Sequence, residues 1–276
     1  MVDNIVGDDF TKNQSLFPPI GYYQRNLSHT DTDIIYAGNR FFGDSWPLNM
    51  KLILKKIVQN TSDIKTFIFD NNGSIGWIAG QYMRYQLPHS NPDDRGISRF
   101  FTISSAPFEK DIHLTTRITS PSSTFKQNLI NLKLGQTIEA FGPNGKFIVQ
   151  DPDSPSIFIA GGIGITPYYS MIKQLNHQKA PINITLLYAN KAEDAVFKKE
   201  LANFAQKSPS FRIEYFIGDN RLEISHIQSL ISKSPNSTIY LSGPEQMMAS
   251  LSRSLSDLGV AEENIRHDFF PGYLNI

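Results

Sequence analysis

Apolar and polar positions follow two different rhythms along this chain. Between residues 49 and 150 they alternate in short runs, which is typical of half-buried strands. The expected strands are 50–57, 65–70, 82–87, 99–105, 112–119 and 137–141. Turn-forming clusters such as Asn71-Asn72-Gly73 and Gly142-Pro143-Asn144-Gly145 separate these runs. Six short strands at this spacing predict a small antiparallel β-barrel or sandwich.

From residue 152 onward, expected strands alternate with expected helices. The strands are 156–160, 183–189, 211–217 and 238–242, and the helices are 166–174, 194–206, 223–232 and 245–258. The last helix repeats apolar residues at helical spacing, at Met248, Leu251 and Leu255. Strands that alternate with helices predict a doubly wound parallel sheet. The Pro- and Asp-rich segment Gln150–Pro155 marks the boundary between the two regions.

Residues 1–48 fit neither rhythm. They mix turn residues with eight aromatic side chains. They contain six Asp and three basic residues, which gives a net charge of about −3. This segment is too aromatic for a flexible linker. We therefore expect a three-part organisation: an N-terminal extension over 1–48 that could dock a partner, a barrel over 49–151 and an α/β domain over 152–276.

Composition narrows the function. The 276 residues carry 26 basic and 26 acidic side chains and no cysteine. Overall charge gives no support for nucleic-acid binding, and disulfides, thiolate metal sites and cysteine-bound iron–sulfur clusters are excluded. The scattered histidines predict no metal site. No apolar run reaches the roughly 18 residues of a membrane span. The acidic N-terminus lacks the apolar core of a secretory signal, so we expect a soluble cytoplasmic protein.

The strongest local motif is Ala160–Pro167, with the sequence AGGIGITP, between an apolar strand and a helix. Glycines at such a turn let the backbone approach a pyrophosphate, and the helix N-terminus supplies N–H donors. Thr166 is expected to cap the helix, with Pro167 at its first helical position. Pro167 stands where the third glycine of the usual dinucleotide fingerprint would be, so a tight turn without a ligand remains an alternative.

Two further segments carry candidate chemistry. Ser242–Met247 forms a second glycine turn after the last predicted strand, at the sheet edge where open α/β folds bind ligands. In the barrel region, Arg99–Ser105 alternates two faces, with Arg99 and Phe101 on one and Thr102 on the other. An arginine fork can hold a phosphate, and an aromatic ring can stack on another ring. The alternative for Arg99 is a surface arginine that is only solvated and binds no ligand.

Taken in chain order, these segments resemble the motifs of the ferredoxin–NADP reductase superfamily. The matching segments are Gly80-Gln81-Tyr82, Arg99–Thr102, His113–Thr119 with Ser122–Thr124, Leu132–Gln136, Gly142–Phe147, Ala160–Pro167, Ser242–Met247 and Asp268–Tyr273. The departures are Phe101 in place of the usual Tyr, Ser242 in place of Cys, Asp268 in place of Glu and Ser122 in place of Gly. The resemblance runs from about Lys51 to Tyr273 and leaves residues 1–48 unexplained.

The resemblance implies a flavin on the barrel, FAD rather than FMN, and NADH or NADPH on the α/β domain. Arg99 would hold the flavin phosphate, Phe101 would pack on the ring or ribityl, and Thr102 would bond near flavin N5. The residues that would line the diphosphate are Thr116, Arg117, Ser123 and Thr124. The residues that would hold the nicotinamide nucleotide are Gly162, Gly164, Thr166, Gly243 and Pro244. Phe270 would cover the flavin and move aside for nicotinamide. Thr102, Ser242 and Phe270 are thus the expected catalytic residues.

The implied activity is hydride transfer from NAD(P)H to flavin, followed by electron transfer to a carrier protein, a haem or a metal complex. A docking or electron-transfer flavoprotein subunit without catalysis is the main alternative, and a nucleotide-binding protein without flavin is a weaker one. Glu193 and Asp194, after the second strand of the α/β region, favour the ribose hydroxyl of NADH over the phosphate of NADPH. Lys191 and Arg221 favour the phosphate of NADPH instead. Alternatively, Glu193 and Asp194 have no part in nucleotide selection and only start the next helix, where acidic residues suit the N-terminus.

Overall fold

The computed structural model describes residues 49–73 and 75–268. All six strands expected in the first region are present. They are β1 (Asn49–Gln59), β2 (Ile64–Asp70), β3 (Tyr82–Gln86), β4 (Ser98–Thr102), β5 (Ile112–Arg117) and β6 (Thr137–Asn144). Their order in the sheet is β4-β3-β6-β1-β2-β5, and every pairing is antiparallel. A bridge between Ile103 and Leu114 brings the two edges together, so the sheet curls back on itself.

The barrel core follows from the alternation of side chains along these strands. Leu52 on β1 lies opposite Ile138 on β6, and Phe67 on β2 lies opposite Leu114 on β5. All four side chains are buried. Helix α2 (Thr124–Asn131) packs Phe125 and Leu129, one helical turn apart, against the same core. This helix was not predicted from the sequence, and it places its N-terminus next to β4 and β5.

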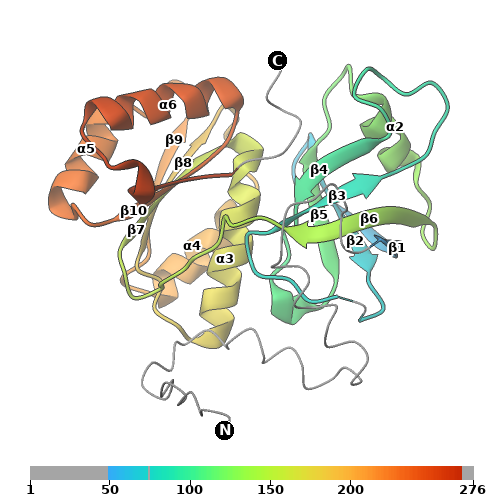
Figure 1. The fold of residues 1–276 in the computed structure, drawn as a ribbon, viewed down its shortest axis with the longest axis horizontal. Coiled ribbons are helices and arrows are strands. Elements are labelled where there is room, and N and C mark those ends of the chain that lie inside the picture. Colours follow the sequence, from blue (N-terminus) through green and yellow to red (C-terminus); the bar gives the residue numbers. More distant parts are fainter. Residues whose placement is uncertain (1–48, 74, 269–276) are drawn as a thin grey trace, which may run out of the picture. The chain divides into compact units, whose positions relative to one another are not determined.

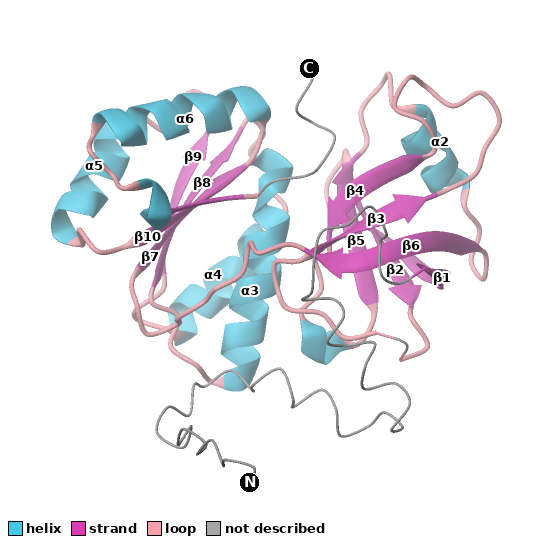
Figure 2. Ribbon diagram, viewed as in Figure 1, coloured by secondary structure: helices cyan, strands magenta, loops and turns pink. Residues whose placement is uncertain are grey.

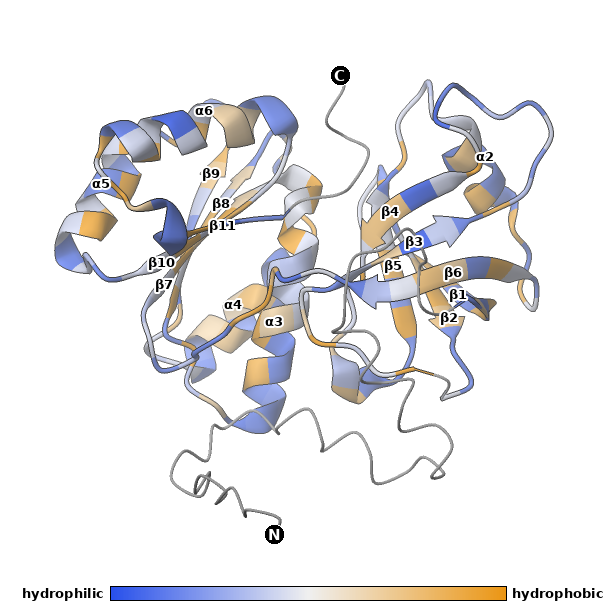
Figure 3. Cartoon of the chain, in the orientation of Figure 1, coloured by the Kyte–Doolittle hydropathy of each residue, from blue (hydrophilic) through white to orange (hydrophobic). Residues whose placement is uncertain are grey.

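The second region forms a five-stranded parallel sheet. Its strands are β7 (Ser156–Gly161), β8 (Ile184–Asn190), β9 (Arg212–Ile217), β10 (Thr238–Ser242) and β11 (Ile265–His267), in the order β11-β10-β7-β8-β9. Figure 3 shows that the central strands of this sheet are largely hydrophobic. Strand β7 is buried along its whole length. The strand order reverses between β7 and β10, which is where open parallel sheets bind ligands.

Helices cover both faces of this sheet, as a doubly wound fold requires. They are α3 (Ile165–Gln178), α4 (Lys198–Lys207), α5 (Ile224–Lys233) and α6 (Glu245–Asp257). Figure 2 shows α3 and α4 on one face and α5 and α6 on the other. Accordingly, Tyr168 of α3 stacks on Phe158 of β7, while Ile227 of α5 and Leu255 of α6 share a core with Ile157. The predicted two-domain fold class is therefore confirmed (Figure 1).

One predicted helix begins later than expected. The sequence placed residues 194–206 in a helix with Phe197 on its apolar face, but α4 begins at Lys198. Phe197 adopts a left-handed backbone conformation, with φ of 63°. Its ring stacks on that of Tyr169 with 3.7 Å between the ring centres. The apolar side chain is thus used for packing on α3 rather than as part of α4.

Helix α3 also joins the parallel sheet to the barrel. Ser170 Oγ donates to the carbonyl of Ser105 at 2.6 Å, and both residues are fully buried. Trp77 Nε1 donates to the same carbonyl at 3.2 Å. Lys173, one turn further along α3, forms an ion pair with Glu109 of the short helix Pro107–Glu109. The helix that begins at the glycine turn therefore lies directly on the barrel.

Candidate functional site

The two glycine turns meet at the point where the strand order reverses. Gly162–Gly164 forms a single turn between β7 and α3, and Gly162 has φ of +54°, a conformation that favours glycine. A Cβ on Gly164 would lie 2.7 Å from Gly243 N and would also collide with the carbonyl oxygen of Ser242. A Cβ on Gly243 would lie 3.0 Å from Gly161 Cα. The glycines therefore allow the backbones of the two turns to touch.

The start of α3 differs from the expectation that Thr166 would cap it. Gly164 is the N-cap residue and Ile165 is the first helical residue, so Thr166 is the second helical residue and Pro167 is the third instead of the first. Thr166 Oγ1 donates to the carbonyl of Ile163 at 3.2 Å instead of accepting from a helix N–H. The prediction of Thr166 as N-cap is wrong because the turn of Gly162–Gly164 leads directly into the helix. Thr166 is buried beside the turn.

Ser242, at the end of β10, forms a polar pair with Asp268. Its hydroxyl donates to Asp268 Oδ2 at 2.7 Å. Asp268 Oδ1 is buried and has no hydrogen-bond partner among the described residues. Burial raises the pKa of Asp268 to about 7, although the hydrogen bond from Ser242 works in the opposite direction. The pair therefore combines a hydroxyl donor with a carboxyl group that titrates near neutral pH.

Asp268 also links the parallel sheet electrostatically to the barrel. Burial raises the pKa of Tyr82 on β3, and the nearby charge of Asp268 raises it further. Tyr82 pairs directly with Thr102 on β4. The barrel strand pair that carries Thr102 therefore lies within electrostatic range of the Ser242–Asp268 pair. The expected catalytic residue Phe270 lies outside the described residues.

Cationic side chains gather at the N-terminus of α2. Ser123 caps this helix by accepting the backbone N–H of Lys126 at 3.3 Å. The Lys126 ammonium donates to the carbonyl of Arg117 at 2.7 Å. Burial lowers the pKa of Lys126 to about 8, and repulsion from Arg95, Arg99 and Arg117 adds to this effect. Such a concentration of positive charge at a helix N-terminus is suited to binding an anion.

Arg99 lies in this cluster, but its guanidinium already has several partners. It is 3% exposed, and its Nη1 donates to the carbonyls of Arg95, Gly96 and Ser98 at 2.7–3.0 Å. Its Nη2 is paired with Asp93 Oδ1 at 2.5 Å. Arg99 Nε is buried without a partner among the described residues. Only this nitrogen of the predicted phosphate ligand is uncommitted.

The other predicted flavin ligands surround the same helix. Phe101 packs its ring against Phe125 of α2 and Tyr85 of β3, each with 5.9 Å between ring centres. Thr102 and Thr116 are buried on β4 and β5. Thr124, the first residue of α2, uses its hydroxyl to accept the backbone N–H of Asp93 at 3.0 Å. These contacts bring Arg99, Phe101, Ser123 and Thr124 together around one end of α2.

Asn190 connects the two halves of the candidate site; it lies in the segment 187–194, considered from the sequence for ribose selection, but was given no role of its own. It ends β8 and is 8% exposed. Its Oδ1 accepts from Arg117 Nη2 at 3.4 Å and lies 3.8 Å from where a Cβ on Gly162 would be. Arg117 also pairs with Asp63 at 3.2 Å. Asn190 is thus the neighbour of both the glycine turn and the cationic cluster.

The segment 191–194, which is expected to distinguish the ribose hydroxyl of NADH from the phosphate of NADPH, is exposed. Lys191, Glu193 and Asp194 follow β8 and lie before α4, which begins only at Lys198. The two acids therefore do not start the helix, which removes one alternative explanation for them. Arg221, in the connection between β9 and α5, is exposed as well.

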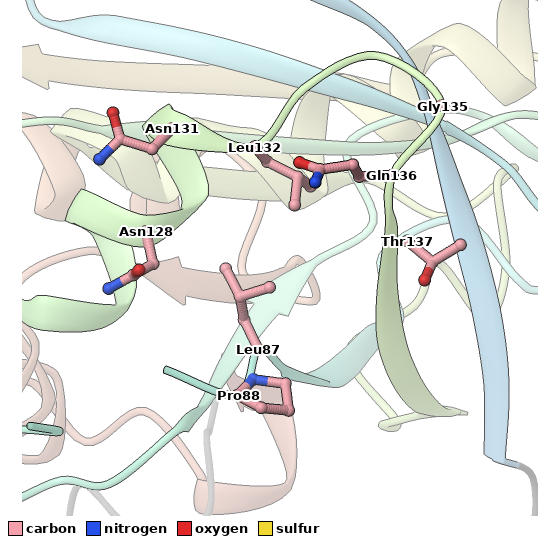
Figure 4. Close-up of a pocket in the computed structure, with 8 residues that line it drawn as sticks. All are labelled: Leu87, Pro88, Asn128, Asn131, Leu132, Gly135, Gln136 and Thr137. Atoms are coloured by element: carbon pink, nitrogen blue, oxygen red, sulfur yellow. The ribbon is translucent and has the colours of Figure 1, made fainter. Parts of the chain in front are cut away.

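A separate hollow of about 540 Å³ lies beside the C-terminal half of α2. Figure 4 shows Asn128 and Asn131 of α2 on one side of it and Gln136 and Thr137 on the other. None of the predicted ligand residues is among those that line it. The hollow is therefore distinct from the cationic cluster and the glycine turns.

Known proteins with similar sequences include oxidoreductases. Residues 158–253 match the family described as "Oxidoreductase NAD-binding domain". The chain is 24% identical over 249 residues to Flavohemoprotein A of Dictyostelium discoideum, covering 84% of this chain and 62% of the relative. It is 29% identical over 198 residues to the F subunit of the Na(+)-translocating NADH-quinone reductase of Marinomonas sp., covering 66% of this chain and 47% of the relative.

Solved structures agree on the fold. Flavohemoglobin from Malassezia yamatoensis, with bound FAD and heme, superimposes with a TM-score of 0.68 at 21% identity, over 81% of this chain and 60% of that one. A mutant ferredoxin-NADP+ reductase from Plasmodium falciparum gives 0.68 at 18% identity, over 80% and 96%. Residues 158–253 thus resemble an oxidoreductase NAD-binding domain, and the described part of the chain shares the two-domain fold of these solved structures.

The chain spans about half to three-fifths of the length of these two curated relatives. Within residues 49–73 and 75–268 it has no helix that combines the length and the apolar character needed to cross a bilayer. The family motifs quoted from the sequence account for both glycine turns and for the strand that carries Arg99. They do not account for Asp93.

Proposed function

We propose that this chain is a flavin-dependent oxidoreductase that takes hydride from NAD(P)H and passes electrons to a second acceptor. The barrel holds FAD, and the parallel sheet holds the nicotinamide nucleotide at its two glycine turns. FAD, when bound, supplies the hydride acceptor and a centre that releases electrons one at a time. The acceptor is a carrier protein, a haem or a metal complex, and residues 1–48 are the candidate docking segment.

The observation that carries this proposal is the cationic cluster at the N-terminus of α2. Arg95, Arg99, Arg117 and Lys126 are close enough that their mutual repulsion contributes to the low pKa of Lys126. A diphosphate fits this set of donors because it would relieve that repulsion and accept charge-assisted hydrogen bonds. The glycine turns supply a second phosphate site on the same molecule. Asp268, which accepts from Ser242 beside the second glycine turn, acts electrostatically on Tyr82 of the barrel.

Individual residues then have definite tasks. Arg99, Ser123 and Thr124, with Thr116 and Arg117 beside them, hold the flavin diphosphate, and Phe101 supports the flavin through its contact with Phe125. Thr102 provides a hydroxyl near flavin N5. Gly162, Gly164 and Thr166 hold the pyrophosphate of the nicotinamide nucleotide, with Gly243 and Pro244 in the adjoining turn.

Ser242 and Asp268 control a proton close to the nicotinamide. Because Ser242 donates to Oδ2, the proton that Asp268 keeps near neutral pH sits on Oδ1. Oδ1 then acts as a hydrogen-bond donor in a buried setting where it has no other described partner. Phe270, two residues further along the chain, lies outside the described residues; its proposed role, taken from the motif alone, would be to cover the flavin and move aside for nicotinamide.

The test is the visible spectrum of the purified protein, before and after addition of FAD. A flavoprotein absorbs at about 450 nm, and NADH should bleach that band. The Arg99→Ala variant should lose about 1.5–3 kcal/mol of flavin affinity, because it removes a charge-assisted phosphate contact. Arg253→Ala, at an exposed arginine of α6, is the matched control, and circular dichroism checks that both variants fold.

Each negative result has a separate meaning. A protein that binds neither FAD nor FMN after reconstitution would refute the flavin assignment and leave a nucleotide-binding protein without flavin. A yellow protein that NADH does not bleach would refute catalysis and leave an electron-transfer or docking subunit.

A further inference from the structure

The loop between β3 and β4 carries a carboxylate into the cationic cluster. Asp93 lies in this loop, and its side chain is 24% exposed, whereas that of Arg99 is 4% exposed. Asp93 Oδ1 is paired with Arg99 Nη2 at 2.5 Å. Asp93 Oδ2 accepts the backbone N–H of Thr124, the first residue of α2, at 3.1 Å. One carboxylate thus binds both the arginine fork and the helix N-terminus.

These two donors are the ones that the proposed function assigns to the flavin diphosphate. An arginine fork and a helix N-terminal N–H are the usual partners of a phosphate oxygen. Asp93 makes the same two bonds with its two carboxylate oxygens. It therefore occupies the position of an anionic ligand while being part of the chain.

The cluster has more cationic side chains than carboxylates: Asp93 pairs with Arg99 and Asp63 with Arg117. Repulsion from Arg95, Arg99 and Arg117 still adds to the effect of burial in lowering the pKa of Lys126. Burial opposes ionisation of Asp93, but the bonds from Arg99 and Thr124 hold its pKa below the ordinary value, so it is ionised at neutral pH. A diphosphate carries more negative charge than one carboxylate and would neutralise the cluster more fully.

We propose that Asp93 is an internal competitor for the anion site of the barrel, so that binding of the flavin diphosphate requires the β3–β4 loop to release Arg99 and Thr124. This inference rests on the proposed function, and it concerns how that site is regulated. It implies that flavin is held as a dissociable ligand whose affinity is set by the loop.

The attachment of the loop suits such an exchange. At its base, Leu87 N–H donates to the carbonyl of Ile97 at 3.0 Å, which continues the β3–β4 ladder. Beyond this base, His89 Nε2 lies 3.0 Å from Thr124 Oγ1, and the same hydroxyl accepts the N–H of Asp93 at 3.0 Å. The described polar contacts from the outer loop to α2 therefore converge on Thr124. Release of that one residue frees the loop from the helix.

The experiment compares Asp93→Asn with Asp94→Asn in the full chain. Asp94 is the exposed neighbour in the same loop, so it matches the change in charge without the contacts to Arg99 and Thr124. FAD and riboflavin are titrated into flavin-free protein and binding is followed by flavin fluorescence. We expect Asp93→Asn to tighten FAD binding by about tenfold, the scale of one charge-assisted hydrogen bond, and to leave riboflavin unchanged because riboflavin has no phosphate. Asp94→Asn should change neither by more than about twofold.

A second readout uses inorganic pyrophosphate and needs no flavin. Amide hydrogen exchange should show that pyrophosphate lowers the protection of the Asp93 amide in the wild type, because its acceptor Thr124 is withdrawn. Weaker FAD binding in Asp93→Asn would overturn the inference and make Asp93 a residue that positions Arg99. Equal effects of the two variants, or no binding of FAD and pyrophosphate to any of the proteins, would overturn it too. Bound flavin that NADH fails to reduce would refute the oxidoreductase proposal alone, since competition is measured by binding.

Discussion

Replacement of Asp268 by asparagine should change how the stability of the protein depends on pH. The carboxyl group is buried, and its pKa is raised from 3.8 to about 7. Between these two values the folded chain holds a proton on Asp268 that the unfolded chain has released. The free energy of unfolding therefore falls as the pH rises from about 4 to about 7, and this contribution is constant above that range. An asparagine side chain at this position has no proton to lose, so the variant lacks this contribution to the slope.

The size of the effect follows from the shift. A change of roughly three pKa units, at about 1.4 kcal/mol per unit, gives a ceiling of about 4 kcal/mol between the ends of the range. The asparagine side chain has nearly the same shape and can still accept the hydrogen bond from Ser242. Relative to the wild type, the variant should thus gain up to about 4 kcal/mol in free energy of unfolding between pH 4 and pH 8.

Urea unfolding at several pH values measures this difference directly. Asp257→Asn, at an exposed position at the end of α6, makes the same change in charge without the burial and should leave the slope as in the wild type. Parallel stability curves for the wild type and Asp268→Asn across this range would show that the carboxyl group is not desolvated in the folded protein. The proton assigned to Oδ1 would then have no basis.

The remaining predictions concern the nucleotide side of the site. Gly164→Ala should destabilise the protein by about 1–3 kcal/mol in urea unfolding and weaken NADH binding, because its methyl group collides with the backbone of the second turn; unchanged NADH affinity would separate this turn from the nucleotide. The kcat/KM should be higher with NADH than with NADPH at one fixed acceptor and ionic strength, since Glu193 and Asp194 repel a phosphate; a clear preference for NADPH would reverse this and point to Lys191 or Arg221. Phe270→Ala should change nicotinamide affinity and the rate of flavin reduction far more than flavin content, and wild-type values for both would remove Phe270 from the site.

Sequence periodicity was sufficient where side chains repeat at a fixed interval. The alternation in β1 to β6 and the helical spacing in α6 report directly on which face is buried, and both were predicted correctly. Helix α2 has only Phe125 and Leu129 as buried positions in eight residues, too few to show a period. Strand β11, with three residues, is shorter still. Its pairing with β10 depends on the neighbouring strand and not on any pattern of its own.

The polar part of the site was less accessible to sequence reasoning for a related reason. The motif around Arg99 indicates a residue that binds phosphate, but in the structure Arg99 pairs with Asp93. Asp93 lies in the β3–β4 loop, and a loop has no repeating pattern of side chains from which its conformation could be predicted. A motif names Asp268, but neither its burial nor that of Asn190 follows from the sequence, because the surrounding tertiary structure creates it. Motifs could identify residues of the site in advance, while the contacts that these residues make could not be predicted.

The position of β6 in the barrel has a consequence for how the chain acquires its structure during synthesis. β6 is the last barrel strand in the sequence, yet it lies between β3 and β1 and pairs with both. A nascent chain that ends before residue 137 can form the β1–β2–β5 and β3–β4 pairings but has nothing to join β1 to β3. Those two strands then expose open edges, which promote association with other chains. Barrel formation must therefore wait for Thr137–Asn144 to leave the ribosome, and this long-range step should be slow relative to local pairing.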